Sequence, residues 1–216
     1  MATYPPGWLA APGRLLLMRH GRLAEGDGRR YLGQGDPPLA PEGEAQMRAW
    51  RPILASLPLA FVQASDLARA RQSAAIATQG AGLAVETDPA WREIDLGDWE
   101  GRAMDEVARL WPESHAARGA DPAGFRPPGG ESFADLLARV WPAFMALAAR
   151  PGPGLVVTHA GVLRVLVCRL LGAPLSQVFA FNPHPAGLCL VDCAGQLPRL
   201  AALNLPPLLD SGINPA

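Results

Sequence analysis

Cysteine is scarce in this chain. The 216 residues include three cysteines, Cys168, Cys189 and Cys193, an odd number without the paired spacing of a metal site. Such a set favours free thiols in a reducing cytoplasm over a disulfide framework or a zinc site. We therefore expect a cytoplasmic protein with no structural disulfide and no bound metal.

Long apolar runs and an excess of charge are also lacking. No apolar stretch reaches the length of a transmembrane helix, and residues 1–13 hold no basic region of a signal peptide. The formal net charge is −1, so neither nucleic acid nor a membrane surface is expected as a partner. The length suits one domain over residues 1–216, with residues 1–13 as an irregular lead-in.

Glycine and proline are abundant, with 23 of each, and they gather between periodic segments. These clusters predict long loops at residues 22–40 and 114–130. Continuous apolar runs predict buried strands at residues 14–18, 61–64, 83–87, 154–158, 188–192 and 200–203. Helical spacing of apolar residues predicts helices at residues 41–57, 65–80, 104–110, 133–148 and 162–171.

The order of these elements indicates the fold class. Strands alternate with helices, which predicts an α/β protein: a three-layer α/β/α sandwich with a mainly parallel sheet. Ser65 or Asp66 is expected to cap the helix that follows the second strand, and Ser132 the helix at 133–148.

The first strand runs directly into Arg19-His20-Gly21. Ligands of open α/β sheets bind beyond the carboxyl ends of the strands, so chemistry is expected here. An arginine can hold a phosphate by two hydrogen bonds, and an unprotonated imidazole can attack phosphorus. Gly21 would leave room for a ligand to approach closely. The alternative is a strand end that simply meets solvent.

A second strand ends in the same way, at His159-Ala160-Gly161. Parallel strands bring their carboxyl ends to one edge of the sheet, so His20 and His159 are expected to share a pocket. His159 also lies near the start of a helix, where free N–H groups favour an anion.

Arg69 and Arg71 lie near the start of another helix, where cations are locally unfavourable. A bound phosphate would explain one of them; the alternative is a solvated face that pairs with Asp66. Two positions this close in sequence point in different directions, so at most one should face the pocket.

An acid is also needed to protonate the leaving oxygen of a phosphate ester. Glu93 lies in a segment flanked by tryptophans and is the first candidate, with Asp95, Asp98 and Glu100 as competitors.

Five segments, in order and over nearly the whole chain, resemble the histidine phosphatase superfamily, also called the phosphoglycerate mutase-like fold. They are residues 17–21, 65–70, 93 with 97–101, 128–132 and 157–162. The resemblance implies that His20 is the phosphorylated nucleophile and Glu93 the proton donor. It also implies that Arg19, Arg69 and protonated His159 form the phosphate pocket, and it gives Arg71 no role.

The same resemblance implies four further contacts to substrate: Gly21, Arg22, Gln34 and Ala160. One segment departs from the family pattern, because Arg22, Leu23 and Gly26 stand where the family usually has glutamate, threonine and asparagine. Leucine and glycine side chains cannot donate a hydrogen bond to phosphate, so Arg22 is left to supply positive charge.

Within the family, the likeness is greatest to the alpha-ribazole phosphatases of cobalamin synthesis. It implies a cofactor-independent hydrolase of a small phosphorylated metabolite; a homodimer is left open. The alternatives are a broad-specificity sugar or nucleotide phosphatase, a phosphoglycerate mutase, and a non-catalytic module that binds a phosphorylated ligand. Leu23 and Gly26 keep the last alternative open.

Overall fold

A six-stranded sheet of order β3-β2-β4-β1-β5-β6 forms the centre of the protein. The computed structural model describes residues 4, 7–24 and 30–207. The strands are β1 (Arg14–Arg19), β2 (Phe61–Ala64), β3 (Val85–Thr87), β4 (Gly154–Thr158), β5 (Leu188–Asp192) and β6 (Arg199–Leu205). The first four pair in parallel, whereas β5 and β6 are antiparallel to their neighbours. The expected mainly parallel sheet is confirmed.

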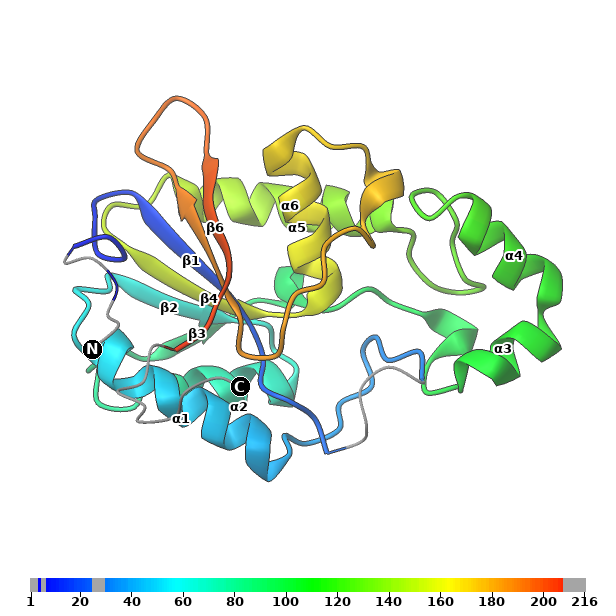
Figure 1. Ribbon diagram of the computed structural model, residues 1–216, viewed down its shortest axis with the longest axis horizontal. Helices are drawn as coiled ribbons and strands as arrows, with labels where there is room; N and C mark the ends of the chain where they lie inside the picture. The colour runs from blue at the N-terminus through cyan, green and yellow to red at the C-terminus, as the bar shows by residue number, and fades with distance from the viewer. Residues whose placement is uncertain (1–3, 5–6, 25–29, 208–216) are drawn as a thin grey trace, which may run out of the picture.

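Helices cover both faces of this sheet (Figure 1). They are α1 (Pro41–Ala55), α2 (Ala68–Ala77), α3 (Met104–Leu110), α4 (Pro112–Ala120), α5 (Phe133–Ala148) and α6 (Ala160–Leu171). Figure 1 shows α1 and α2 below the sheet, α5 and α6 above it, and α3 with α4 beyond its edge. This arrangement is the expected three-layer sandwich.

Strand β1 contributes side chains to both hydrophobic cores, because its successive side chains point to opposite faces of the sheet. Leu16 and Met18 pack in the core under α1 and α2. Leu15 and Leu17 pack in the core under α5 and α6. All four are nearly inaccessible to water, which explains why the segment reads as a continuous apolar run rather than as an alternating one.

The two predicted helix caps have different outcomes. Ser132 caps α5 in a capping box with Asp135, as expected. The expectation for α2 is wrong: its N-cap is Leu67, and neither Ser65 nor Asp66 bonds to its first turn. The carboxylate of Asp36 accepts the N–H groups of Ala68 and Arg69 instead. Asp36, which lies 32 positions before Ala68 in the sequence, thus replaces the expected local cap.

The prediction of a loop at residues 114–130 is also wrong, because helix α4 extends over residues 114–120 of this segment. Pro112 lies in the first turn, where its missing N–H costs nothing. Good helix formers follow, notably Glu113, Ala116 and Ala117. Trp111 is shared, as the C-cap of α3 and the N-cap of α4.

All three cysteines are free thiols, as expected. Burial raises the pKa of Cys189 to about 11. Among the described residues, none of the helices combines the length and the apolar character that crossing a membrane requires.

We predict that Ser132→Ala will lower the free energy of unfolding by about 1 kcal/mol, because α5 loses its capping hydrogen bonds. Urea unfolding followed by circular dichroism measures the change. Ser132→Thr is the matched control, since it keeps the hydroxyl oxygen and is expected to lose less than half as much. Equal losses in the two variants would show that the cap does not hold α5.

Candidate active site

His20 and His159 lie side by side at the carboxyl edge of the sheet. Strands β1 and β4 pair in register, with Arg19 opposite Thr158, and the residues that follow are the two histidines. The His20 N–H donates to the Thr158 carbonyl at 3.0 Å. The two imidazole centroids are 5.2 Å apart, and the exposed fractions are 4% and 0%. The sheet therefore brings the two predicted histidines together.

The hydrogen bond of His20 defines its tautomer. Its Nδ1 lies 2.8 Å from the carbonyl oxygen of Gly21, and a carbonyl can only accept, so Nδ1 carries the proton. Burial lowers the pKa of His20 well below its usual value, and the guanidinium groups of Arg19 and Arg69 lower it further. The imidazole is therefore neutral, and Nε2 presents a lone pair.

Arg69 fixes the opposite tautomer in His159. Its Nε–H donates to Nδ1 of His159 at 3.2 Å, so that nitrogen accepts and Nε2 carries the proton. Arg69 is 1% exposed, whereas Arg71 is exposed. Of these two arginines, the structure brings only Arg69 to the histidines.

In the free protein the structure favours a neutral His159, in place of the protonated ring that the resemblance implies for the phosphate-bound state. Burial lowers the pKa of His159 well below its usual value, and nearby cations, Arg69 first, lower it further. A second proton would also displace the hydrogen bond from Arg69 to Nδ1. The neutral ring still offers a donor, because its buried Nε2 has no hydrogen-bond partner among the described residues.

Glu93 lies at the N-terminus of α6, next to His159. One carboxylate oxygen accepts the N–H of Gly161 and the other that of Ile94, both at 2.9 Å. A Cβ on Gly161 would lie 2.2 Å from this carboxylate, so the glycine makes the contact possible. Glu93 is 7% exposed.

The three competing carboxylates have other environments. Asp95 accepts the N–H of Gly97, Asp98 is exposed, and Glu100 bonds to the backbone of residues 33–35. Of the four acids, only Glu93 contacts the first turn of α6. The structure therefore favours Glu93 by position.

Three of the other predicted contacts lie beside this centre. Arg19 donates to the Pro183 carbonyl at 2.9 Å, and Ala160 opens α6 beside His159. Gln34 donates to the Glu93 carbonyl at 3.5 Å. Arg22 is exposed.

Gly21 and Leu23, which follow His20, both pack against other parts of the protein. A Cβ on Gly21 would lie 2.5 Å from the Gly43 carbonyl, so this glycine admits helix α1 rather than a ligand. Leu23 is 4% exposed and forms an isolated bridge with Leu39, so it packs into the protein. Gly26 lies outside the described residues.

Three residues beside this centre escaped the sequence analysis. Phe179 is 50% exposed, and the guanidinium groups of Arg118 and Arg164 lie 5.5 and 5.4 Å from its ring. Arg164 donates to the Phe181 carbonyl, two residues from the carbonyl that holds Arg19. No sequence signal links these residues, because α4, α6 and the following loop meet only in the folded chain.

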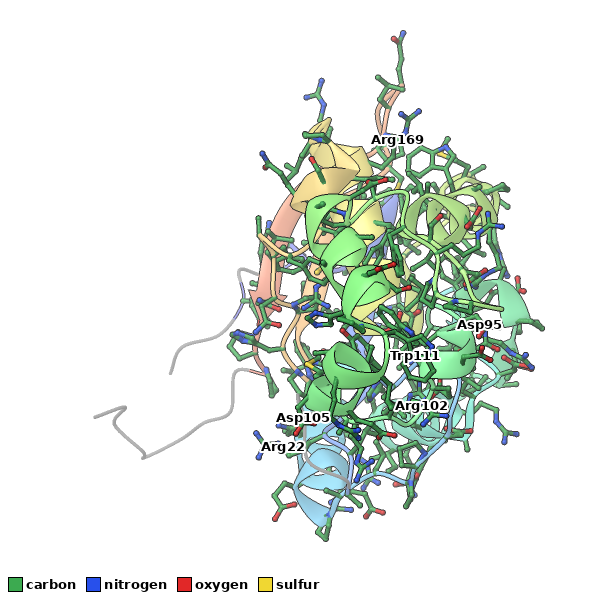
Figure 2. All side chains as sticks on the ribbon, turned by 90° about the vertical axis from the view of Figure 1, so that its right-hand side faces the viewer. Arg22, Asp95, Arg102, Asp105, Trp111 and Arg169 are labelled. Atoms are coloured by element: carbon green, nitrogen blue, oxygen red, sulfur yellow. The ribbon has the colours of Figure 1, made fainter. Side chains whose placement is uncertain are left out.

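Helices α3 and α4 cover this end of the molecule, and Figure 2 views it face-on. Arg102 lies over the Trp111 ring, 5.0 Å from its centroid, in the front of that view. Trp91 and Trp99 are fully buried in the core. Within residues 4, 7–24 and 30–207, no group of three or more histidine, cysteine or acidic side chains could hold a metal ion.

Comparison with known proteins places this geometry in a family. The family model described as "Histidine phosphatase superfamily (branch 1)" matches residues 15–206. A bifunctional protein of Mycobacterium tuberculosis is 35% identical over 193 residues, which are 87% of this chain and 53% of that protein. The chain thus spans about half the length of that relative.

Two relatives of more similar length are named for different activities. The adenosylcobalamin/alpha-ribazole phosphatase of Salmonella typhimurium is 30% identical and covers 88% of this chain and 96% of its own. The glucosyl-3-phosphoglycerate phosphatase of Mycolicibacterium vanbaalenii is 33% identical and covers 76% of each. The crystal structure of the alpha-ribazole phosphatase from Shigella flexneri superposes with a TM-score of 0.81 at 28% identity, over 89% of this chain and 96% of that one.

We predict that the free energy of unfolding falls as the pH drops from 7.5 to 5.5. Unfolded histidines titrate near pH 6.5, whereas His20 and His159 titrate lower when folded. Between the two values the unfolded chain binds more protons, so acid favours unfolding, by up to about 1.4 kcal/mol per pH unit for each histidine.

Urea unfolding at several pH values measures this slope, in a range above the titration of most carboxylates. His159→Gln removes one of the two groups and is expected to flatten the slope by about half. A wild-type stability that does not change over this range would contradict the assignment of two neutral buried imidazoles.

Proposed function

The chain belongs to the histidine phosphatase superfamily, and we propose that it is a phosphomonoester hydrolase that forms a phosphohistidine at His20. One domain, in the cytoplasm, carries this activity. The observation that supports it most is the His20 imidazole itself: it is buried and neutral, its Nδ1–H faces the Gly21 carbonyl so that Nε2 keeps its lone pair, and Arg19 and Arg69 are near enough to lower its pKa. A nucleophile needs that lone pair, and a phosphate dianion needs those charges.

In the first step, Nε2 of His20 attacks phosphorus and a nitrogen–phosphorus bond forms. The bond between phosphorus and the ester oxygen breaks, and the carboxyl group of Glu93 gives its proton to the departing alkoxide. Arg19, Arg69 and the Nε2–H of neutral His159 donate to the non-bridging oxygens. Preorganised donors of this kind usually supply the largest part of catalysis.

In the second step, the Glu93 carboxylate takes a proton from water as that water attacks the phosphohistidine. The nitrogen–phosphorus bond breaks, inorganic phosphate leaves, and both side chains return to their starting states. The backbone N–H groups of Ile94 and Gly161 hold the Glu93 side chain in place through both steps.

Alpha-ribazole 5′-phosphate is the substrate that we propose first. The support is the 30% identity to an alpha-ribazole phosphatase over nearly that protein's whole length. The half-exposed ring of Phe179 and the guanidinium groups against it offer flat surfaces on which a benzimidazole can stack.

A phosphoglycerate that carries a sugar in glycosidic linkage, and so keeps its carboxylate free, is the second candidate, and Arg118 favours it. Its guanidinium lies over the rings of Tyr31, Phe133 and Phe179, and it has no ion pair within the described part of the chain. A glycerate carboxylate would provide an ion-pair partner for Arg118, whereas alpha-ribazole 5′-phosphate has no anionic group besides its phosphate.

We predict that phosphate release will be fastest from alpha-ribazole 5′-phosphate and will be lost in His20→Ala. The assay compares this ester with glucosyl-3-phosphoglycerate and with a panel of sugar and nucleotide monophosphates. Activity in His20→Ala would overturn the phosphohistidine route. Wild-type protein that binds inorganic phosphate but releases none from any ester would support the non-catalytic module instead, and phosphoryl transfer to a glycerate would support a mutase.

Arg118→Ala separates the two substrate candidates. Loss of a hydrogen bond to a charged group predicts a fall of about tenfold in kcat/KM for glucosyl-3-phosphoglycerate. For alpha-ribazole 5′-phosphate the expected change is less than threefold, since only stacking is lost. A tenfold fall for alpha-ribazole phosphate alone would reverse the assignment of Arg118. Arg109→Ala, on neighbouring helix α3, is the control for the loss of one positive charge.

A further inference from the structure

Residues 33–35 lie between a carboxylate and a buried guanidinium. On one side, the Glu100 carboxylate accepts the N–H groups of Gly33, Gln34 and Gly35 at 3.0–3.1 Å. On the other side, the carbonyls of Gly33 and Gly35 accept from the two terminal nitrogens of Arg69. The same short segment thus binds an anion by its N–H groups and a cation by its carbonyls.

This arrangement couples Glu100 to Arg69 without direct contact. Three successive N–H groups directed at one carboxylate form a concave anion site, here filled by the protein's own side chain. The Gly33–Gln34 peptide links the two charges directly, because its N–H points at the carboxylate and its oxygen at the guanidinium. Burial lowers the pKa of Arg69, and the nearby carboxylates, Glu100 among them, oppose that shift.

The close contact between residues 33–35 and Glu100 requires glycine at positions 33 and 35. A Cβ on Gly33 would lie 2.3 Å from the Ile94 carbonyl, and a Cβ on Gly35 would lie 2.7 Å from the Glu100 carboxylate. The Tyr31 carbonyl accepts the N–H of Gly101, and the Tyr31 N–H donates to the Arg102 carbonyl, so the two segments are held in register. Glu100 therefore faces the loop because the backbone pairing places it there.

We propose that Glu100 is a positioning residue: by holding residues 33–35, it orients the Arg69 guanidinium and, through it, the tautomer of His159. The chain of contacts runs from the Glu100 carboxylate to three N–H groups, from two carbonyls to Arg69, and from Arg69 Nε to His159 Nδ1. The proposal rests on Arg69 binding phosphate, as in the proposed function. It does not require turnover.

Glu100→Gln tests this proposal, because it keeps the shape of the side chain and removes its charge. We expect the dissociation constant of inorganic phosphate, measured by titration calorimetry, to rise about tenfold, as for one lost hydrogen bond to a charged group. We also expect the ¹⁵N resonances of the His159 imidazole to shift, because Nδ1 loses its fixed donor. A purely structural role of Glu100 would not move the His159 signals while the fold is unchanged.

Two further variants complete the experiment. Glu106→Gln removes a partly exposed carboxylate that pairs with Arg102 at 2.9 Å, and it is expected to leave phosphate affinity within twofold of wild type. Glu100→Asp keeps the charge and is expected to recover most of the affinity for phosphate. If Glu100→Gln does not fold, Glu100→Asp is the variant compared with wild type.

The outcomes separate this proposal from the proposed function. Unchanged phosphate affinity and unchanged His159 signals in folded Glu100→Gln would overturn the positioning role. So would a Glu100→Asp variant that binds phosphate as weakly as the Gln variant. If the wild-type protein binds phosphate without releasing it from esters, the proposed function fails, but the affinities of the variants still decide the role of Glu100.

Discussion

The parallel pairing of β1 with β4 is the constraint on which the site depends. The two strands are distant in sequence, yet their register sets Arg19 opposite Thr158 and the two histidines next to each other. Both strands are buried on both faces, so a shift of either one would move apolar side chains out of two cores at once. The distance between the imidazoles is therefore fixed by packing far from the site itself.

Burial and charge together decide the protonation of this site. Two neutral imidazoles and a buried guanidinium lie against one another, and backbone groups complete their hydrogen bonds at Gly21, Gly33 and Gly35. Because His20 donates through Nδ1 and His159 accepts through Nδ1, the Nε2 atoms of the two rings differ, one with a lone pair and one with a proton. A phosphate group needs this combination of one nucleophile and one donor.

The sequence predicted the parts of the fold that depend on local pattern. The buried strands, the Ser132 cap and the convergence of His20 and His159 all follow from apolar runs and from the polar residues that end them. Helix α4 was missed because proline and glycine hide its helix formers. The Asp36 cap, the tautomers and the contacts of Phe179 were beyond reach, since each joins segments that meet only after folding.

The cap that Asp36 provides limits how substrate can enter. Its carboxylate holds the first N–H groups of α2 and also pairs with the Arg69 guanidinium at 3.5 Å. An outward movement of residues 33–36 would remove the cap of α2 and would leave the buried Arg69 guanidinium without its partners in this segment. Residues 33–36 can therefore move away from the site only together with α2, as one cooperative unit.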